Sequence, residues 1–294
     1  MNEDANNVLL LLGMHRSGTS LLGKWLHHCG LFVGRRLLGA NKSNPGGHFE
    51  DLDFLEFHND LLAFNQTVPL GEKPPNSFAI EPYHRQRASA LATFKTQLNT
   101  HWAWKDPRSC LFLNNLWKEV LPDAKALIIF RDYKAVVQSL IRRDLQLLGK
   151  DFDKLEQLFG SLLSIARPLI KIRLHFFRKH YMRQIDHHIR LYLQNWIWHQ
   201  QELKKFLENH HDPNASAIVA YEQLADQQGR LLQKVRKDWG FPLHSYPLAD
   251  VRLRKPIVPI AKLYNHPWPQ DLSRQAEQLL EYFRQHPQNL QHGA

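Results

Sequence analysis

A short apolar run near the N-terminus, with the loop and the helix-like segment that follow it, most constrains the fold of this chain. Residues 8–12 are all Val or Leu, as expected for a strand that is buried on both faces of a parallel sheet. The loop after this run contains Gly13 and Gly18, and residues 19–28 then place Leu and Trp side chains at helical spacing. The order strand, short loop, helix favours an α/β fold with right-handed crossovers.

Three further segments have the composition of strands, and most of the chain between them has helical spacing. The strands are expected at residues 101–105, 126–130 and 217–220. The clearest helices are expected over residues 19–28, 52–64, 83–100, 110–120, 231–239 and 272–283. We therefore predict an α/β fold with a doubly wound, mainly parallel sheet flanked by helices. Residues 1–294 are expected to form a single domain with a helical elaboration at about 151–211.

Composition indicates the charge of a binding partner but not its chemical class. The 294 residues carry 38 Lys and Arg against 28 Asp and Glu, a formal net charge of +10, which predicts an anionic partner such as nucleic acid, a membrane surface or a phosphorylated small molecule. A hydrophobic content of 43% excludes a disordered chain, and two cysteines are too few for a disulfide framework. No apolar run approaches membrane-spanning length and the N-terminus is acidic, so a cytoplasmic location is expected.

The loop after the first strand has the glycine spacing of a phosphate-binding loop. Small residues there let successive backbone N–H groups surround an anion at a helix N-terminus. Nucleotide hydrolases place a lysine at the position of Thr19, whereas this chain carries its cation inside the loop, at Arg16. This arrangement suits a short, diphosphate-like anion. The alternative is a tight turn that binds no ligand.

This loop resembles the 5′-phosphosulfate loop of the sulfotransferase family, whose members use 3′-phosphoadenosine-5′-phosphosulfate (PAPS) and share a fold with phosphate-loop nucleotide kinases. The resemblance implies that the donor's 5′-phosphate is held by backbone amides and hydroxyls of Ser17, Gly18, Thr19 and Ser20. It also implies that Arg16 stabilises charge on the leaving phosphate, where cytosolic members have a lysine. Arginine keeps the charge and makes proton donation less suitable.

A second element resembles the family's grip on the donor's 3′-phosphate. Arg131 follows the strand at 126–130, and Ser139 lies eight residues further on in a helical segment, which matches the family spacing. An arginine at the carboxyl edge of a sheet, beside a helix N-terminus, is well placed to bind phosphate. The alternative is that Arg131 pairs with Asp132 and Ser139 is solvated.

Two later segments resemble further parts of the donor site. Tyr221, in Tyr-Glu-Gln-Leu, corresponds to a family tyrosine that lies against the adenine, although it could equally close an edge of the core. The basic tract at 252–255 stands where cytosolic members have a glycine-containing donor loop. Because this tract has no glycine, no role is assigned to its residues.

On the acceptor side, sulfuryl transfer needs a base for the hydroxyl proton and cations for the oxygens on sulfur. Lys105 matches the lysine of the family's second strand and is expected to contact the sulfuryl group. The histidine that follows this lysine in cytosolic members is absent. Asp106 and Arg108 are expected to pair with each other or to organise the loop.

The missing histidine directs attention to residues 47–50, Gly-His-Phe-Glu, which resemble a Gly-aromatic-Glu motif of bacterial and carbohydrate sulfotransferases. Glu50 is the candidate base and His48 its rival, with Glu50 preferred. The alternative is that Glu50 and the aspartate after it only favour a helix N-terminus.

The sequence thus predicts a PAPS-dependent sulfotransferase that moves the sulfuryl group to an acceptor hydroxyl, on a small molecule or carbohydrate, by in-line displacement. Neither a metal site nor a nucleic-acid partner is expected. A phosphotransferase using ATP would need the loop lysine that Thr19 replaces. A non-catalytic nucleic-acid-binding protein would explain the charge, but not the loop glycines. The basic tract at 171–180 is expected to be a solvated helix face.

Overall fold

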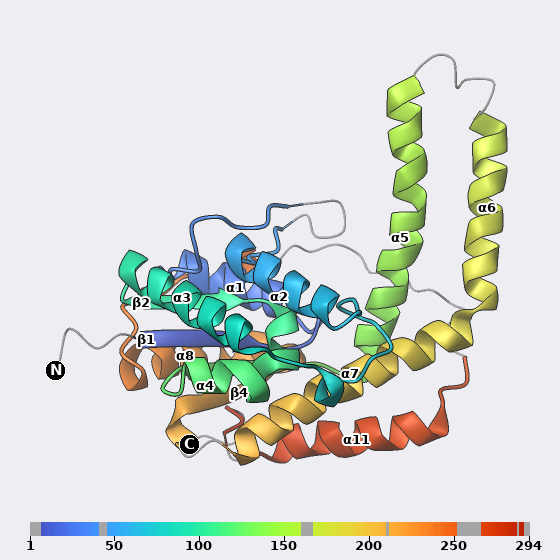
Figure 1. Cartoon of the computed structure of the whole chain (residues 1–294). Coiled ribbons are helices and arrows are strands. Elements are labelled where there is room, and N and C mark those ends of the chain that lie inside the picture. The colour runs from blue at the N-terminus through green and yellow to red at the C-terminus, as the bar shows by residue number, and fades with distance from the viewer. Residues whose placement is uncertain are drawn as a thin grey trace.

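The centre of the molecule is a four-stranded parallel sheet with strand order β2-β1-β3-β4 (Figure 1). The strands are β1 (Asn7–Leu12), β2 (His101–Lys105), β3 (Lys125–Phe130) and β4 (Ser216–Ala220). All four lie within one residue of the predicted segments, so the α/β prediction is confirmed. The computed structural model describes residues 7–40, 46–159, 167–209, 212–251, 266–286 and 288–290.

Helices cover both faces of the sheet because successive strand residues point to opposite sides. Leu9 and Leu11 enter one core cluster, under α1 (Thr19–His28), α8 (Leu224–Gln233) and α9 (Leu248–Val251). Leu10 and Leu12 enter the other cluster, with α2 (Leu52–Phe64), α3 (Pro82–Leu98) and α11 (Gln270–Gln285). The sheet is therefore doubly wound, as predicted.

The predicted helical elaboration divides into two parts with different surroundings. The helices α5 (Tyr133–Phe159) and α6 (Arg167–Arg183) form a hairpin that projects from the body of the molecule (Figure 1). The next helix, α7 (Ile185–Glu208), packs along α5 and α11, and its Trp196 is fully buried. Of the predicted elaboration, α7 therefore belongs to the core. This helix crosses the edge of the sheet at which the candidate site lies.

Residues 110–120 differ from the uninterrupted helix that their spacing suggests. They form 3-10 and π-helical turns, η2 (Pro107–Phe112) and η3 (Leu113–Trp117), before a single α-turn, α4 (Lys118–Val120). The Asp106 side chain caps η2 by accepting a hydrogen bond from the Arg108 amide at 3.0 Å. Nearly every side chain of η2 is buried, so packing sets this local geometry in place of helix propensity.

The remaining elements are short. The turns η1 (Pro75–Ser77), η5 (Pro213–Ala215) and η6 (Tyr221–Gln223) are 3-10 helical, and η7 (Lys234–Asp238) is a π-helical turn that ends the helix predicted at 231–239. That helix begins earlier than predicted, at Leu224. The basic tract at 252–255 lies outside the described residues. Within the described residues, no helix is long and apolar enough to cross a membrane.

Candidate functional site

The loop between β1 and α1 is shaped by two glycines in positive-φ conformations. Gly18 precedes α1 with φ 98°, and a Cβ there would lie 2.3 Å from Cδ2 of Tyr221. A Cβ on Gly13 would lie 2.4 Å from the carbonyl oxygen of Ile129. No side chain caps the start of α1, which leaves its first amides available to an anion. The glycines that the sequence suggested for a phosphate loop are therefore required by its geometry.

Arg16 is the centre of the donor side. Its backbone has φ 69°, a left-handed conformation that costs free energy for a residue other than glycine and that is common at binding sites. Its Nε donates a hydrogen bond of 2.9 Å to Oγ of Ser139. Its carbonyl oxygen accepts a 3.2 Å hydrogen bond from Nη1 of Arg131. Three residues that the sequence assigned to the donor from two distant motifs thus lie together.

Four guanidinium groups gather here, and we call Arg16, Arg131, Arg142 and Arg143 the arginine cluster. Burial and the charges of the other three lower the pKa of Arg16 from its ordinary value. Arg131 also lies over the ring of Tyr221, with 4.3 Å between the guanidinium carbon and the ring centroid. Among the described residues no carboxylate forms an ion pair with Arg16. The cluster therefore has the electrostatics of a site for a multiply charged anion.

Two polar atoms of the residues that the sequence assigned to the donor are buried without a hydrogen-bond partner among the described residues. They are Oγ of Ser17, whose residue is fully buried, and Nε of Arg131. An unpaired buried polar atom costs about 1–3 kcal/mol. Both atoms can donate to phosphate oxygens, so the unsatisfied groups fit a phosphorylated ligand.

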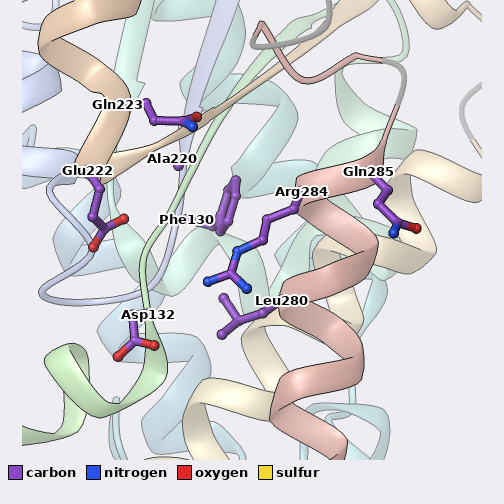
Figure 2. A pocket seen from close by; sticks show the side chains of 8 residues that line it. All are labelled: Phe130, Asp132, Ala220, Glu222, Gln223, Leu280, Arg284 and Gln285. Carbon is purple, nitrogen blue, oxygen red and sulfur yellow. The ribbon is translucent and has the colours of Figure 1, made fainter.

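A cavity of about 450 Å³ lies beside the arginine cluster, at the carboxyl ends of β3 and β4, with α11 on its far side (Figure 2). One of its wall residues, Glu222, lies 3.6 Å from Nε of Arg131. None of the predicted site residues lines it. Its lining residues are Phe130, Asp132, Ala220, Glu222, Gln223, Leu280, Arg284 and Gln285.

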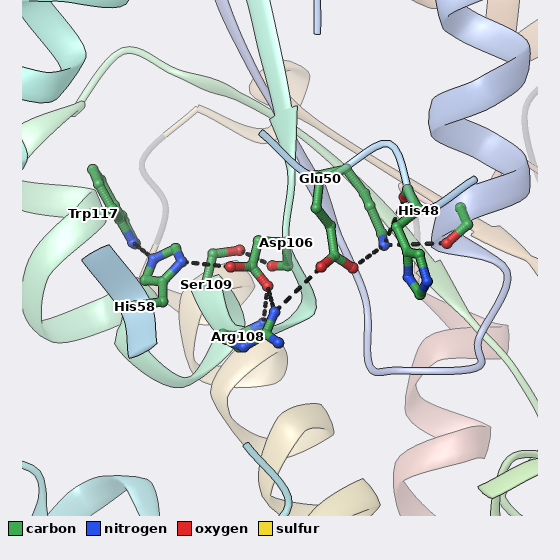
Figure 3. A network of polar contacts seen from close by, with 9 residues as sticks. His48, Glu50, His58, Asp106, Arg108, Ser109 and Trp117 are labelled. Atoms are coloured by element: carbon green, nitrogen blue, oxygen red, sulfur yellow. Dashed lines mark hydrogen bonds and ion pairs between the residues drawn. The ribbon is translucent and has the colours of Figure 1, made fainter. Parts of the chain in front are cut away.

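On the acceptor side, Lys105 connects the end of β2 with the loop and with residues 47–50. Its Nζ lies 2.6 Å from Oε1 of Glu50 and donates to Oγ of Ser20 and to the carbonyl oxygen of His48, both at 3.2 Å (Figure 3). Lys105 and Glu50 are both buried, at 2% and 4% exposure. The expected cation, Lys105, and the candidate base, Glu50, are thus in direct contact.

The contacts continue inward from Glu50 to the core, and we call Lys105, Glu50, Arg108, Asp106 and His58 the carboxylate network. Nη1 of Arg108 lies 3.4 Å from Oε2 of Glu50 and 2.8 Å from Oδ1 of Asp106 (Figure 3). The expected pairing of Asp106 with Arg108 is confirmed.

His58 ends the network in the core and is electrically neutral. Its Nδ1 lies 2.7 Å from Oδ2 of Asp106, and its Nε2 accepts a 2.8 Å hydrogen bond from the Trp117 indole. Because the indole can only donate, Nδ1 carries the imidazole proton and donates to Asp106. Burial opposes ionisation of Asp106, yet Arg108 and His58 hold its pKa well below the usual range.

Glu50 stands directly before the start of α2 but does not cap it. The residue that caps α2 is Asp51, whose Oδ1 accepts a 2.9 Å hydrogen bond from the Asp53 amide. The Glu50 side chain contacts Lys105, and the Phe49 between it and His48 has φ 55°. The half-buried His48 side chain has a pKa lowered chiefly by burial. The alternative of a helix N-terminus therefore holds for Asp51, whereas the Glu50 carboxylate pairs with a cation.

Several residues at the site were not among those predicted. Arg142 and Arg143 lie three and four positions after Ser139, one helical turn away, so the pattern of α5 could have indicated them. His15 stands inside the loop that was singled out. His58 comes from a helix 48 residues before Asp106, and no local signal connects the two.

Comparisons with known proteins bear on the fold. No family model matches the sequence, and no curated protein is significantly similar to it. The sulfotransferase domain from the curacin biosynthetic pathway matches with a TM-score of 0.50 at 15% identity, over 94% of this chain and 98% of that domain. The chain has a sulfotransferase-like fold.

Two other solved structures have lower TM-scores. The sulfotransferase domain from the Synechococcus PCC 7002 olefin synthase gives 0.47 at 17% identity, over 97% of each chain. A sulfotransferase from Mycobacterium avium gives 0.38 at 14% identity, over 97% of this chain and 69% of its own. At these TM-scores neither structure adds to the assignment of the fold.

Proposed function

We propose that this protein is a sulfotransferase that moves the sulfuryl group of PAPS to an acceptor hydroxyl. The observation that carries the proposal is the convergence of Arg16, Arg131 and Ser139 beside the uncapped start of α1. A phosphate-binding turn alone would not need a partly buried cluster of arginines. A ligand with phosphates at both the 5′ and the 3′ position of one nucleoside would use both features.

Each donor residue has a role that follows from its contacts. Backbone amides of residues 18–20, with the hydroxyls of Ser17, Thr19 and Ser20, would hold the 5′-phosphate, because the Ser17 amide already donates to the carbonyl oxygen of Met14. Arg131 and Ser139 would hold the 3′-phosphate, which takes over the hydroxyl that Arg16 now contacts. The ring of Tyr221 packs on Gly18 and under Arg131, so it borders the same space and can lie against the adenine.

The transfer is an in-line displacement at sulfur. The acceptor oxygen forms a bond to sulfur while the bond from sulfur to the 5′-phosphate oxygen breaks, and adenosine 3′,5′-bisphosphate leaves with that electron pair. Lys105 and Arg16 would stabilise the negative charge on the sulfuryl and phosphate oxygens. The acceptor proton passes to a base, for which Glu50 and His48 are the candidates from sequence.

Ligand-induced thermal stabilisation tests the donor assignment. Adenosine 3′,5′-bisphosphate is expected to raise the melting temperature, whereas ATP with Mg²⁺ is not, because the loop has no lysine for a γ-phosphate. Arg131→Ala should abolish the rise, and Arg178→Ala, at an exposed position on α6, should retain it. Stabilisation by ATP with Mg²⁺ and not by the bisphosphate would contradict the proposal and favour a phosphotransferase.

Substitutions at residues 48 and 50 test the base, and a transfer screen tests the acceptor. If Glu50 is the base, Glu50→Gln should lose turnover while His48→Ala keeps it; the reverse result would assign the role to His48.

Incubation of PAPS carrying labelled sulfate with a cell extract, followed by mass spectrometry, should reveal a sulfated small molecule or carbohydrate. Label confined to nucleic acid or to no product would contradict this acceptor class.

A further inference from the structure

Two histidines that the proposed mechanism does not use face each other where α7 crosses the phosphate loop. His15 lies in the loop, and His199 lies on α7 and is fully buried. Their ring centroids are 6.4 Å apart, and the rings meet edge to face at 72°. No hydrogen bond joins them. At this separation and angle the two rings are in edge-to-face contact.

The protonation state of His199 follows from its contacts. Its Nδ1 lies 2.8 Å from the carbonyl oxygen of Asn195, which can only accept, so Nδ1 carries the proton. Burial lowers the pKa of His199 to about 4, and the ring is neutral at pH 7. Its Nε2 therefore has a free lone pair, yet this atom is buried without a hydrogen-bond partner among the described residues.

His15 also has a ring nitrogen without a hydrogen-bond partner among the described residues, and it lies beside the cations of the acceptor side. Its Nε2 is enclosed and has no partner among the described residues. Burial is the main cause that lowers the pKa of His15 well below the usual value. The charged and titratable groups that act on it are Arg108, His199, Asp106 and Lys105. A neutral imidazole with a free nitrogen thus lies close to both cations of the carboxylate network.

Glu50 is less suited to accept a proton, because both of its carboxylate oxygens are in contact with cations. Oε1 lies 2.6 Å from Nζ of Lys105, and Oε2 lies 3.4 Å from Nη1 of Arg108. Protonation of Glu50 would remove the negative charge from two buried ion pairs. The geometry fits Glu50 as the group that holds the two cations in place.

We propose that His15 takes the acceptor proton in the sulfuryl transfer, and that His199 is a positioning residue whose ring packs edge to face against the His15 ring. This inference rests on the proposed function. In the step, the acceptor O–H bond breaks and its proton passes to a ring nitrogen of His15. The oxygen forms the bond to sulfur, and the bisphosphate leaves with the electrons of the broken S–O bond.

Binding of the donor prepares His15 for this role. The donor brings several negative charges close to Arg108 and Lys105, the cations that disfavour the protonated form of His15. Their compensation raises the pKa of His15 toward neutrality, where a general base is most effective. The base is therefore weak in the free protein and becomes competent when the donor is bound.

NMR of protein labelled in its histidines tests this without any acceptor. The His15 signal is identified by its loss in His15→Gln. In the free protein the pKa of this signal should lie well below the ordinary value for histidine, and saturating adenosine 3′,5′-bisphosphate should raise it by about one unit or more. A bisphosphate that binds but leaves the His15 titration unchanged would overturn the inference.

Release of labelled sulfate from PAPS, with water in place of the acceptor, gives the second readout. His15→Ala should release sulfate about 100-fold more slowly, with bisphosphate binding unchanged, and added imidazole should restore part of the rate. His28→Ala, an exposed histidine in the last turn of α1, is the matched control. A wild-type rate in His15→Ala overturns the inference, whereas a wild-type protein that does not bind the bisphosphate overturns the proposed function.

Discussion

The arginine cluster and the carboxylate network lie at the same edge of the sheet but differ in how their charges are compensated. In the network each cation contacts a carboxylate, with Lys105 2.6 Å from Glu50 and Arg108 2.8 Å from Asp106. In the cluster, Arg143 pairs with Asp144 at 2.9 Å and Arg131 lies 3.6 Å from Glu222, but Arg16 donates its side-chain hydrogen bond to a neutral hydroxyl. The network is thus complete within the protein, whereas Arg16 has no carboxylate partner among the described residues. The comparison distinguishes residues that support the site from residues that bind a ligand.

Asp106→Asn should have the largest effect on stability. The substitution removes the negative charge that faces Arg108 in the protein interior, and the single amide oxygen of asparagine cannot accept from both Arg108 and His58. Loss of one partner from a buried ion pair costs about 3–5 kcal/mol in the free energy of unfolding. Urea denaturation at pH 7.5 measures this loss.

The matched control for Asp106→Asn is Asp60→Asn. Asp60 also pairs with an arginine, Arg87 at 2.9 Å, but its side chain is 57% exposed. An exposed pair of this kind contributes at most about 1 kcal/mol. Equal losses for the two variants would show that the carboxylate network is not the internal support that its burial indicates.

Arg16→Ala should weaken bisphosphate binding without lowering the free energy of unfolding. The free protein should keep its free energy of unfolding, since the substitution relieves repulsion among partly buried guanidiniums. Affinity for adenosine 3′,5′-bisphosphate should fall about 100-fold, the size expected for a lost hydrogen bond to a charged group. Isothermal titration calorimetry measures the affinity, with Arg178→Ala as the control. If Arg16→Ala destabilises the free protein by more than Asp106→Asn does, the roles of the two regions are reversed.

The pH dependence of stability should report on His199. Its pKa is about 4 in the folded protein and about 6.5 in an unfolded chain, so the unfolded chain binds more protons between these values. Stability is therefore lost as pH falls from 6.5 toward 4, by about 2 kcal/mol at pH 5 from this residue. Urea denaturation at pH 7.5 and pH 5.0 should show the loss, and His199→Gln should reduce it. An unchanged pH dependence in the variant would indicate that His199 is not buried in its neutral form.

The sequence predicted the sheet well because its strands are buried on both faces. A continuous apolar run such as residues 126–130 is not compatible with a solvent-facing strand, and the structure places all four runs in one sheet. The donor motifs were also local, so the resemblance of short segments to the sulfotransferase family was enough to name Arg16, Arg131 and Ser139. Residues 110–120 were less predictable because their turns follow from tertiary packing and from the Asp106 cap.

The polar partners of the site could not be predicted, because they depend on contacts between distant elements. His58, on α2, is joined to Asp106, and His199, on α7, faces His15 across 184 residues of sequence. The helical pattern of residues 185–208 predicts a helix but not the element that it covers. Whether Glu50 faced solvent, a helix terminus or a cation also required the structure.

Glu222→Gln should have the smallest effect on bisphosphate affinity. Whether the affinity rises or falls is the most direct test of the difference between the arginine cluster and the carboxylate network. Glu222 lies 3.6 Å from Nε of Arg131, but its side chain is 53% exposed, so it only partly compensates the arginine cluster. A donor phosphate must compete with this carboxylate for Arg131. Its removal should therefore strengthen bisphosphate binding about two- to fivefold, less than 1 kcal/mol. A weaker affinity in Glu222→Gln would place this carboxylate among the groups that hold Arg131 in its binding position, as Glu50 holds Lys105, and the arginine cluster would then be internally supported as well.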